Sequence, residues 1–148
     1  NDIDTSEAGY GLSITSKIKF GEDDLRIMAN IGSGLGRYIA LNASNGAVLD
    51  ANNKLDAIDV RGFTIAYRHL WDEKWRSTFS YAMFSADNDT DLTGLGVIKE
   101  TYSARANILY SPAPELTFGA EYAYAEKTLE SDVDGDMSRL QFSATYAF

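Results

Sequence analysis

Eight basic residues occupy polar positions in segments of this 148-residue chain where polar and apolar residues alternate. Successive side chains of a β-strand point to opposite faces, so residues at alternate positions share one face of a sheet. A face rich in lysine and arginine attracts anions, and arginine binds carboxylate or phosphate groups through paired donors. The basic strip predicted in this way consists of Lys17, Lys19, Arg26, Arg68, Arg76, Arg105, Lys127 and Arg139.

Two interpretations of the basic strip stay open from the sequence. In the first, the strip lowers the energy barrier for anions, as rings of charged side chains do in pores. In the second, these residues pair with acidic groups on other strands or on a loop folded inward. A pore lined by this face would then have no charge preference.

Glu121 is the one acidic residue that the alternation places inside a strand on the same face. If Tyr110 pairs with Leu116 across the turn between them, Arg105 lies directly opposite Glu121. Opposite charges at paired positions of neighbouring strands attract each other. The sequence therefore predicts an ion pair between Arg105 and Glu121 that fixes the wall, while the other basic residues form a positive strip.

Seven segments alternate between polar and apolar positions and are predicted to be strands. No run of about 18 apolar residues is present that would form a transmembrane helix. Within the long polar stretch at 33–56, the pair Asn45 and Gly46 is typical of a hairpin turn. The predicted strands span residues 10–20, 25–32, 58–70, 75–84, 100–110, 116–127 and 137–148.

The connections between the predicted strands alternate between short turns and long loops. Outer-membrane barrels have short periplasmic turns, long extracellular loops and aromatic girdles at both rims. We therefore predict an all-β fold, an antiparallel transmembrane β-barrel with its polar faces toward the lumen. The turns are 21–24, 71–74 and 111–115, and the loops are 33–56, 85–99 and 128–136. The aromatic residues expected at the periplasmic rim are Phe20, Trp71, Trp75, Tyr110, Tyr146 and Phe148.

The final residue, Phe148, orients the predicted barrel. An alternating last strand that ends in phenylalanine resembles the carboxy-terminal insertion signal of bacterial outer-membrane barrels, so it ends on the periplasmic side. Counting back seven strands places Tyr10 on the extracellular side, whereas single-chain barrels have an even number of strands. Either one strand has been missed, or residues 1–148 form the carboxy-terminal part of a larger barrel. We expect the second, with residues 1–9 as a loop or ragged terminus of one partial barrel domain.

A hairpin near the end of the sequence carries a recognisable motif. Residues 104–122 resemble the Asn-x-x-Tyr-Ser-Pro-x-Pro-x-Leu-x-x-Gly-x-Glu-Tyr hairpin of DcaP-like trimeric porins of Gram-negative bacteria. The resemblance implies a trimeric diffusion channel, in some members for negatively charged small solutes. Because the motif is structural, it implies no solute-binding residue. The matching positions are Asn107, Tyr110, Ser111, Pro112, Pro114, Leu116, Gly119, Glu121 and Tyr122.

The composition excludes several classes of function. A net charge of −9 argues against nucleic acid as a partner, and the absence of cysteine rules out disulfides and cysteine metal sites. His69, the only histidine, has no partner motif for catalysis, so we expect no enzyme activity and no cofactor. The acidic loop with Asp132, Asp134 and Asp136 is a weak metal candidate, because it lacks the spacing of a calcium loop.

These patterns predict a portion of an outer-membrane porin wall that passes small hydrophilic, and in one interpretation anionic, solutes. The expected partners are outer-membrane lipid, lipopolysaccharide, the solutes and further copies of the chain in a homotrimer. The small residues Ala104, Ala106 and Ala120 on the apolar face would fit a trimer contact. One alternative is a complete eight-stranded barrel that acts as an anchor or adhesion protein. A second is a soluble ligand-binding β-barrel, which needs apolar residues inside.

Overall fold

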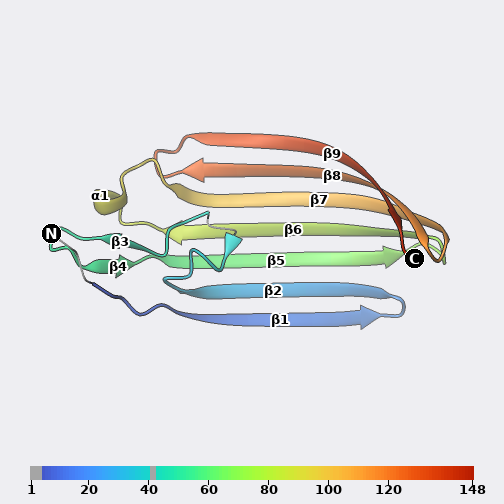
Figure 1. The fold of residues 1–148 in the computed structure, drawn as a ribbon, viewed down its shortest axis with the longest axis horizontal. Helices are drawn as coiled ribbons and strands as arrows, with labels where there is room; N and C mark the ends of the chain where they lie inside the picture. Colours follow the sequence, from blue (N-terminus) through green and yellow to red (C-terminus); the bar gives the residue numbers. More distant parts are fainter. Residues whose placement is uncertain (1–4, 41–42) are drawn as a thin grey trace.

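The computed structural model describes residues 5–40 and 43–148, and most of them lie in β-strands (Figure 1). Of the predicted terminal segment, residues 1–4 lie outside the described part, and residues 5–9 have no regular structure. Among the described residues, no helix combines the length and the apolar character needed to cross a membrane. The long strands are β1 (Tyr10–Phe20), β2 (Asp23–Ser33), β5 (Asp59–Leu70), β6 (Trp75–Asp87), β7 (Ile98–Ala113), β8 (Leu116–Leu129) and β9 (Asp134–Tyr146).

The seven long strands form one antiparallel sheet in the order β1-β2-β5-β6-β7-β8-β9. Each strand pairs with the next long strand along the chain, as expected where short connections join antiparallel neighbours. The prediction of an all-β antiparallel sheet of seven strands is therefore confirmed. Strands β1 and β9 form the two edges, and no ladder joins them in the described part of the chain, so the sheet is open.

The connections are segregated to the two ends of the sheet (Figure 1). One end holds the turns at 21–22, 71–74 and 114–115, and the other holds the segments 34–58, 88–97 and 130–133. A four-residue helix, α1 (Thr90–Thr93), lies in the second of these loops. The last connection is shorter than predicted, because β8 and β9 stay paired as far as Thr128 and Asp134.

A small hairpin, β3 (Ala47–Leu49) and β4 (Leu55–Ala57), lies within the longest loop. Its turn is at 50–54, so the prediction that Asn45 and Gly46 make the turn is wrong. The Asp50 carboxylate makes this turn, since it accepts hydrogen bonds from the backbone N–H groups of Asn52 and Lys54, each at 2.8 Å. The same backbone donors, Lys54 first, hold the pKa of Asp50 below its usual value.

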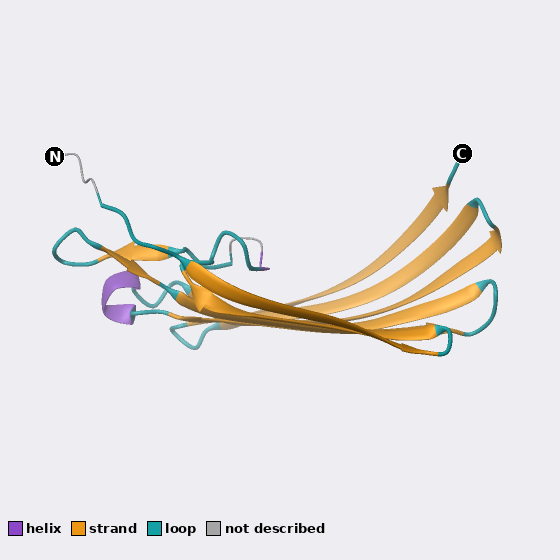
Figure 2. Ribbon diagram, turned by 90° about the horizontal axis from the view of Figure 1, so that it is seen from below, coloured by secondary structure: helices purple, strands orange, loops and turns teal. Residues whose placement is uncertain are grey.

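The loop after β2 packs on one face of the sheet, and this contact is the main buried apolar cluster among the described residues. Ile58, Val60, Phe84 and Ala86 are buried there, and partly buried side chains of the loop cover them. Those side chains are Leu35, Ile39 and Ala43. Figure 2 shows the sheet as a curved layer with this loop on its concave side. The loop therefore covers the end of the concave face that is away from the short turns.

Candidate functional site

Paired residues on the concave face form rows that run across all seven strands. One row consists of Lys17, Arg26, Ala66, Ser80, Arg105, Ala123 and Arg139, each paired with the next. The next row toward the short turns consists of Lys19, Asp24, Arg68, Thr78, Asn107, Glu121 and Gln141. Directly paired side chains of an antiparallel ladder share a face. We call these two lines the basic row and the mixed row.

The two rows hold six of the eight basic residues of the predicted strip. The other two share the face: Arg76 pairs with Leu109 nearer the short turns, and Lys127 pairs with Thr101 nearer the long loops. The register thus brings all eight together on one side of the sheet. Arg76 is tied to the wall, because its Nη1 donates to Ser111 Oγ at 2.9 Å.

The predicted ion pair between Arg105 and Glu121 is wrong. Arg105 lies opposite Ala123, and Glu121 lies opposite Asn107. Glu121 instead contacts Arg139, whose Nη2 lies 3.5 Å from Glu121 Oε1. An exposed, long contact of this kind contributes little to stability.

The register differs from the prediction because β7 continues to Ala113 and contains a bulge between Tyr110 and Ala113. Pro112 cannot donate a ladder hydrogen bond, and Ser111 N donates to Lys74 O in the neighbouring turn instead. Tyr110 consequently pairs with Phe118 rather than Leu116. A shift of two residues preserves the face of every side chain but changes its partner.

Asp24 is a second acid on the concave face that the sequence interpretation assigned to a turn. The turn is only Gly21 and Glu22, with φ +64° at Gly21, so Asp24 lies in β2 and is almost fully buried. Arg26 Nε donates to Asp24 Oδ1 at 2.7 Å, and Arg68 Nη2 lies 2.7 Å from Oδ2. The statement that Glu121 is the only strand acid on this face is therefore wrong.

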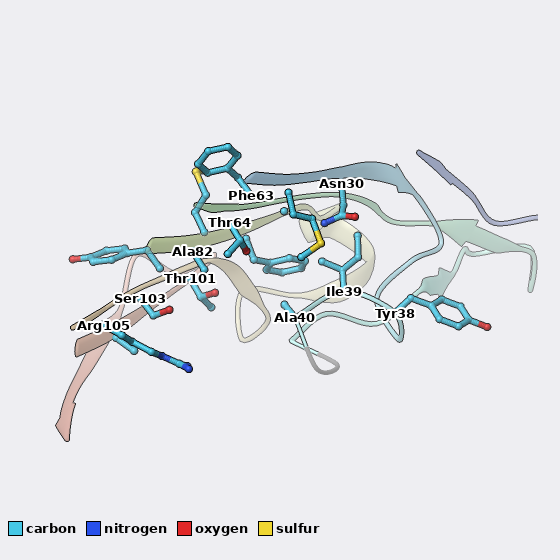
Figure 3. Close-up of a pocket in the computed structure, with 16 residues that line it drawn as sticks. Asn30, Tyr38, Ile39, Ala40, Phe63, Thr64, Ala82, Thr101, Ser103 and Arg105 are labelled. Carbon is cyan, nitrogen blue, oxygen red and sulfur yellow. The ribbon is translucent and has the colours of Figure 1, made fainter. Parts of the chain in front are cut away.

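The remaining cations of the basic strip are more accessible to a solute. In the described part of the chain, Lys19, Arg105 and Lys127 form no ion pair, and all three are exposed on the concave face. Arg105 and the loop after β2 line the same cavity, which has a volume of about 460 Å³. Thr101, Ser103 and Arg105 line this cavity from β7, and Ile39 and Ala40 line it from the loop (Figure 3).

Three glycines let the loop approach the concave face closely. A Cβ added to Gly32 would lie 2.6 Å from Leu35 Cδ1, and one added to Gly11 would lie 2.3 Å from the same atom. A Cβ on Gly62 would lie 3.1 Å from Ile39 Cγ2. Gly11 and Gly32 are paired neighbours on β1 and β2. Leu35 thus occupies a notch that only residues without side chains can provide, and sequence alternation gives no signal for it.

The opposite face of the sheet is apolar and exposed over most of its area. Large side chains such as Leu12, Ile14, Phe79, Leu140 and Phe142 are between 49% and 73% exposed. A soluble barrel places polar residues on its outside and apolar residues within. Here the concave face is polar and the convex face is apolar, which is the arrangement of a barrel with lipid outside.

Aromatic residues mark both edges of this apolar face. At the short turns, the rings of Trp75 and Tyr110 stack with centroids 4.4 Å apart. Phe20, Trp71, Tyr146 and Phe148 lie at the same strand ends, and their role at a membrane rim stays a prediction. Nearer the long loops, Tyr81, Tyr102 and Tyr124 form a second row with centroids 6.4 Å and 6.1 Å apart, which the sequence interpretation missed. Their alternation with small residues was the available signal.

The spacing of the two aromatic rows matches a bilayer. Tyr102 is eight residues from Tyr110 along β7, or roughly 26 Å at about 3.3 Å per residue. At a strand tilt of about 40° this is roughly 20 Å along the membrane normal, close to the apolar band of outer-membrane barrels. Beyond Tyr102, Glu126 accepts hydrogen bonds from Tyr102 Oη at 2.5 Å and from Tyr124 Oη at 2.9 Å. The carboxylate of Glu126 thus lies at the edge of the apolar band.

Other candidate groups from the sequence have structural contacts. Asp132 is 3.1 Å from Lys99 Nζ, whereas Asp134 and Asp136 lie on β9. Within residues 5–40 and 43–148, no group of three or more carboxylate or histidine side chains is placed to hold a metal ion. His69 Nδ1 lies 2.8 Å from Asp23 Oδ2, and its ring contacts Trp71 edge to face.

Comparison with known proteins identifies the family. A family model described as DcaP outer membrane protein matches residues 1–148. The chain belongs to this family. The DcaP family is a family of bacterial outer membrane proteins and not of enzymes, so the predicted family and location are confirmed. No curated protein matches the sequence.

A solved DcaP structure has the same fold. The crystal structure of the outer membrane channel DcaP of Acinetobacter baumannii matches with a TM-score of 0.87 at 17% sequence identity. The match covers 95% of this chain and 41% of that channel, so the chain spans less than half the length of its structural relative. At this identity the likeness shows a shared fold. The open seven-stranded sheet corresponds to part of that channel.

Proposed function

We propose that the chain forms part of the wall of an outer-membrane diffusion channel for small hydrophilic solutes. The carrying observation is the separation of the two faces, with eight basic residues on the concave face and exposed apolar residues on the other. Lipid contact satisfies the apolar face, and water in a lumen solvates the charged face. The loop after β2 lies on the lumen side and narrows the path between Ile39 and Arg105.

We further propose that the lumen favours anionic solutes. Lys19, Arg105 and Lys127 point into it without acidic partners among the described residues, and arginine donors suit carboxylate or phosphate groups. The basic row also slants. Six steps of about 4.8 Å between strands tilted about 40° separate its ends by roughly 18 Å along the pore axis. An anion would therefore meet successive cations along its path rather than one ring.

Cysteine accessibility tests the proposed lumen directly, because residues 1–148 contain no cysteine. Ser103 and Ala104 are neighbours on β7 whose side chains lie on opposite faces. In the full-length protein in native outer membranes, a membrane-impermeant maleimide should label Ser103→Cys but not Ala104→Cys. A negatively charged thiol reagent should react faster than a positively charged one of similar size at Ser103→Cys. Equal labelling of the two positions would contradict the proposed lumen.

The oligomer is a separate part of this proposal. Ala104 and Ala106 form the floor of an apolar groove on the convex face, with Phe79, Tyr81 and Tyr122 among its walls. Small residues permit close approach of a second surface, which favours contact with another copy in a trimer. Lipopolysaccharide and lipid would cover the rest of the face. Cross-linking of Ala106→Cys in membranes with a three-armed maleimide reagent should give trimers, and only monomers would contradict the trimer contact.

A further inference from the structure

Asp24 is a buried carboxylate surrounded by cations on a face that is otherwise open. Its side chain is 2% exposed, whereas the side chains of Lys17, Arg26 and Arg68 around it are between 38% and 56% exposed. Lys17 Nζ lies 3.9 Å from Oδ2. The carboxylate therefore lies beneath the three cations, which cover it from the lumen.

This arrangement affects both the positions of the cations and the net local charge. Arg26 Nε donates a hydrogen bond to Asp24 Oδ1, and Arg68 Nη2 forms an ion pair with Oδ2 at 2.7 Å, so both guanidinium groups are held against the carboxylate. Three cations and one carboxylate leave a local charge of about +2, and removal of the carboxylate would leave about +3. Salt screens the attraction between this buried carboxylate and its paired cations less than it screens an exposed ion pair.

We propose that Asp24 is a specificity-determining residue, a buried counter-ion that holds Arg26 and Arg68 on the wall and limits the anion preference of the pore. The inference rests on the proposed channel function and names a residue that sets the strength of its anion preference. Glu121 has a weaker form of the same role, because it is more exposed and has a single contact at 3.5 Å.

The chain offers a matched control in the adjacent residue. Asp23 lies on the opposite face, where its carboxylate accepts hydrogen bonds from Tyr67 Oη at 2.6 Å and Leu70 N at 2.9 Å. Asp23→Asn and Asp24→Asn change the net charge equally and lie side by side in sequence. Only the second changes the charge on the lumen side.

The test is the anion-to-cation permeability ratio, measured from reversal potentials of the full-length protein in planar bilayers across a KCl gradient. Asp24→Asn should raise the ratio roughly two-fold or more, the Boltzmann factor for one unit charge acting across about 8 Å of water. Asp23→Asn should leave it unchanged. The double variant Asp24→Asn, Arg68→Gln restores the local charge and should return the ratio to the wild-type value.

Equal ratios for Asp24→Asn and Asp23→Asn would overturn the inference. If Asp24→Asn does not assemble, Arg68→Gln alone should lower the ratio by a similar factor, and an unchanged ratio would likewise overturn it. Failure of the proposed function has a different signature. A protein that forms no pore, or whose ratio does not respond to Arg105→Gln, contradicts the channel proposal itself, whereas a response to Arg105 without one to Asp24 contradicts only this inference.

Discussion

The two sides of the concave face carry similar charges but use them differently. On β1, β2 and β5, the guanidinium groups of Arg26 and Arg68 form ion pairs with one buried carboxylate, that of Asp24. On β7, β8 and β9, the acid is Glu121, which is half-buried and makes one long contact. Net charge alone does not distinguish these regions. The burial of the acid distinguishes them, because a fully buried acid fixes its cations and a half-buried one holds them less firmly.

The loop after β2 strengthens this difference. It is anchored over β1, β2 and β5 through Leu35 and Ile39, which pack on Gly11, Gly32 and Gly62. The cavity beside it opens toward Arg105 on β7. The side with fixed cations therefore supports the loop, and the side with free cations borders the open path. Three substitutions test this division, from the largest expected effect to the smallest.

Gly32→Val removes the notch that holds Leu35. Because an added Cβ would meet Leu35 Cδ1 at 2.6 Å and Tyr10 O at 2.2 Å, we expect overpacking that costs roughly 1–3 kcal/mol of stability. The loop should also leave the face and raise single-channel conductance. Urea unfolding and planar-bilayer recordings measure the two effects. Gly135→Val is the matched control, since a Cβ there meets no atom within 4 Å, and equal effects at both positions would contradict the notch.

Arg105→Glu reverses a charge on the side with free cations. A change of two unit charges should lower the anion-to-cation permeability ratio roughly six-fold, from the Coulomb energy across about 8 Å of water. Reversal potentials in a KCl gradient measure this ratio. The control Arg61→Glu makes the same change on the convex face, where Arg61 pairs with Ile31 and Ser85, and should not alter the ratio. A similar response at both positions would contradict the claim that the concave face lines the solute path.

Glu121→Gln removes the half-buried acid and should have the smallest effect. We expect the permeability ratio to rise by less than about two-fold at low salt, because electrolyte screens exposed charges. Reversal potentials at low mean KCl compare the two variants directly, and Asp24→Asn should give the larger increase. An equal or larger increase for Glu121→Gln would show that burial does not distinguish the two acids.

The sequence predicted the faces of this sheet better than its pairings. Polar and apolar alternation placed all eight basic residues on one face, because that property depends only on the period of a strand. The bulge before Ala113 shifted the register by two residues, so the faces were right and the partner of Arg105 was wrong. Asp24 was missed because an acid next to Gly21 and Glu22 is typical of a turn. Its place in β2 is shown by the ladders, in which Asp24 pairs with Lys19 on β1 and with Arg68 on β5.

The contact between the loop and the sheet was beyond sequence prediction for a different reason. Leu35 and Gly32 are close in sequence, but the notch also needs Gly11 on another strand. Glycine in a strand often indicates close approach of another group, but alternation does not say which one. The second aromatic row was only partly visible, because alternation places its tyrosines on the apolar face but not beside one another. Tyr81, Tyr102 and Tyr124 become neighbours only when the register of three strands is known.

The central claim is that the basic concave face lines a path that favours anions. Its most direct test is the reversal potential of the wild-type full-length protein in planar bilayers across a KCl gradient, repeated with Arg105→Gln. We predict a preference for chloride that falls roughly two-fold when this one charge is removed. A preference for potassium that is unaffected by Arg105→Gln would contradict the claim.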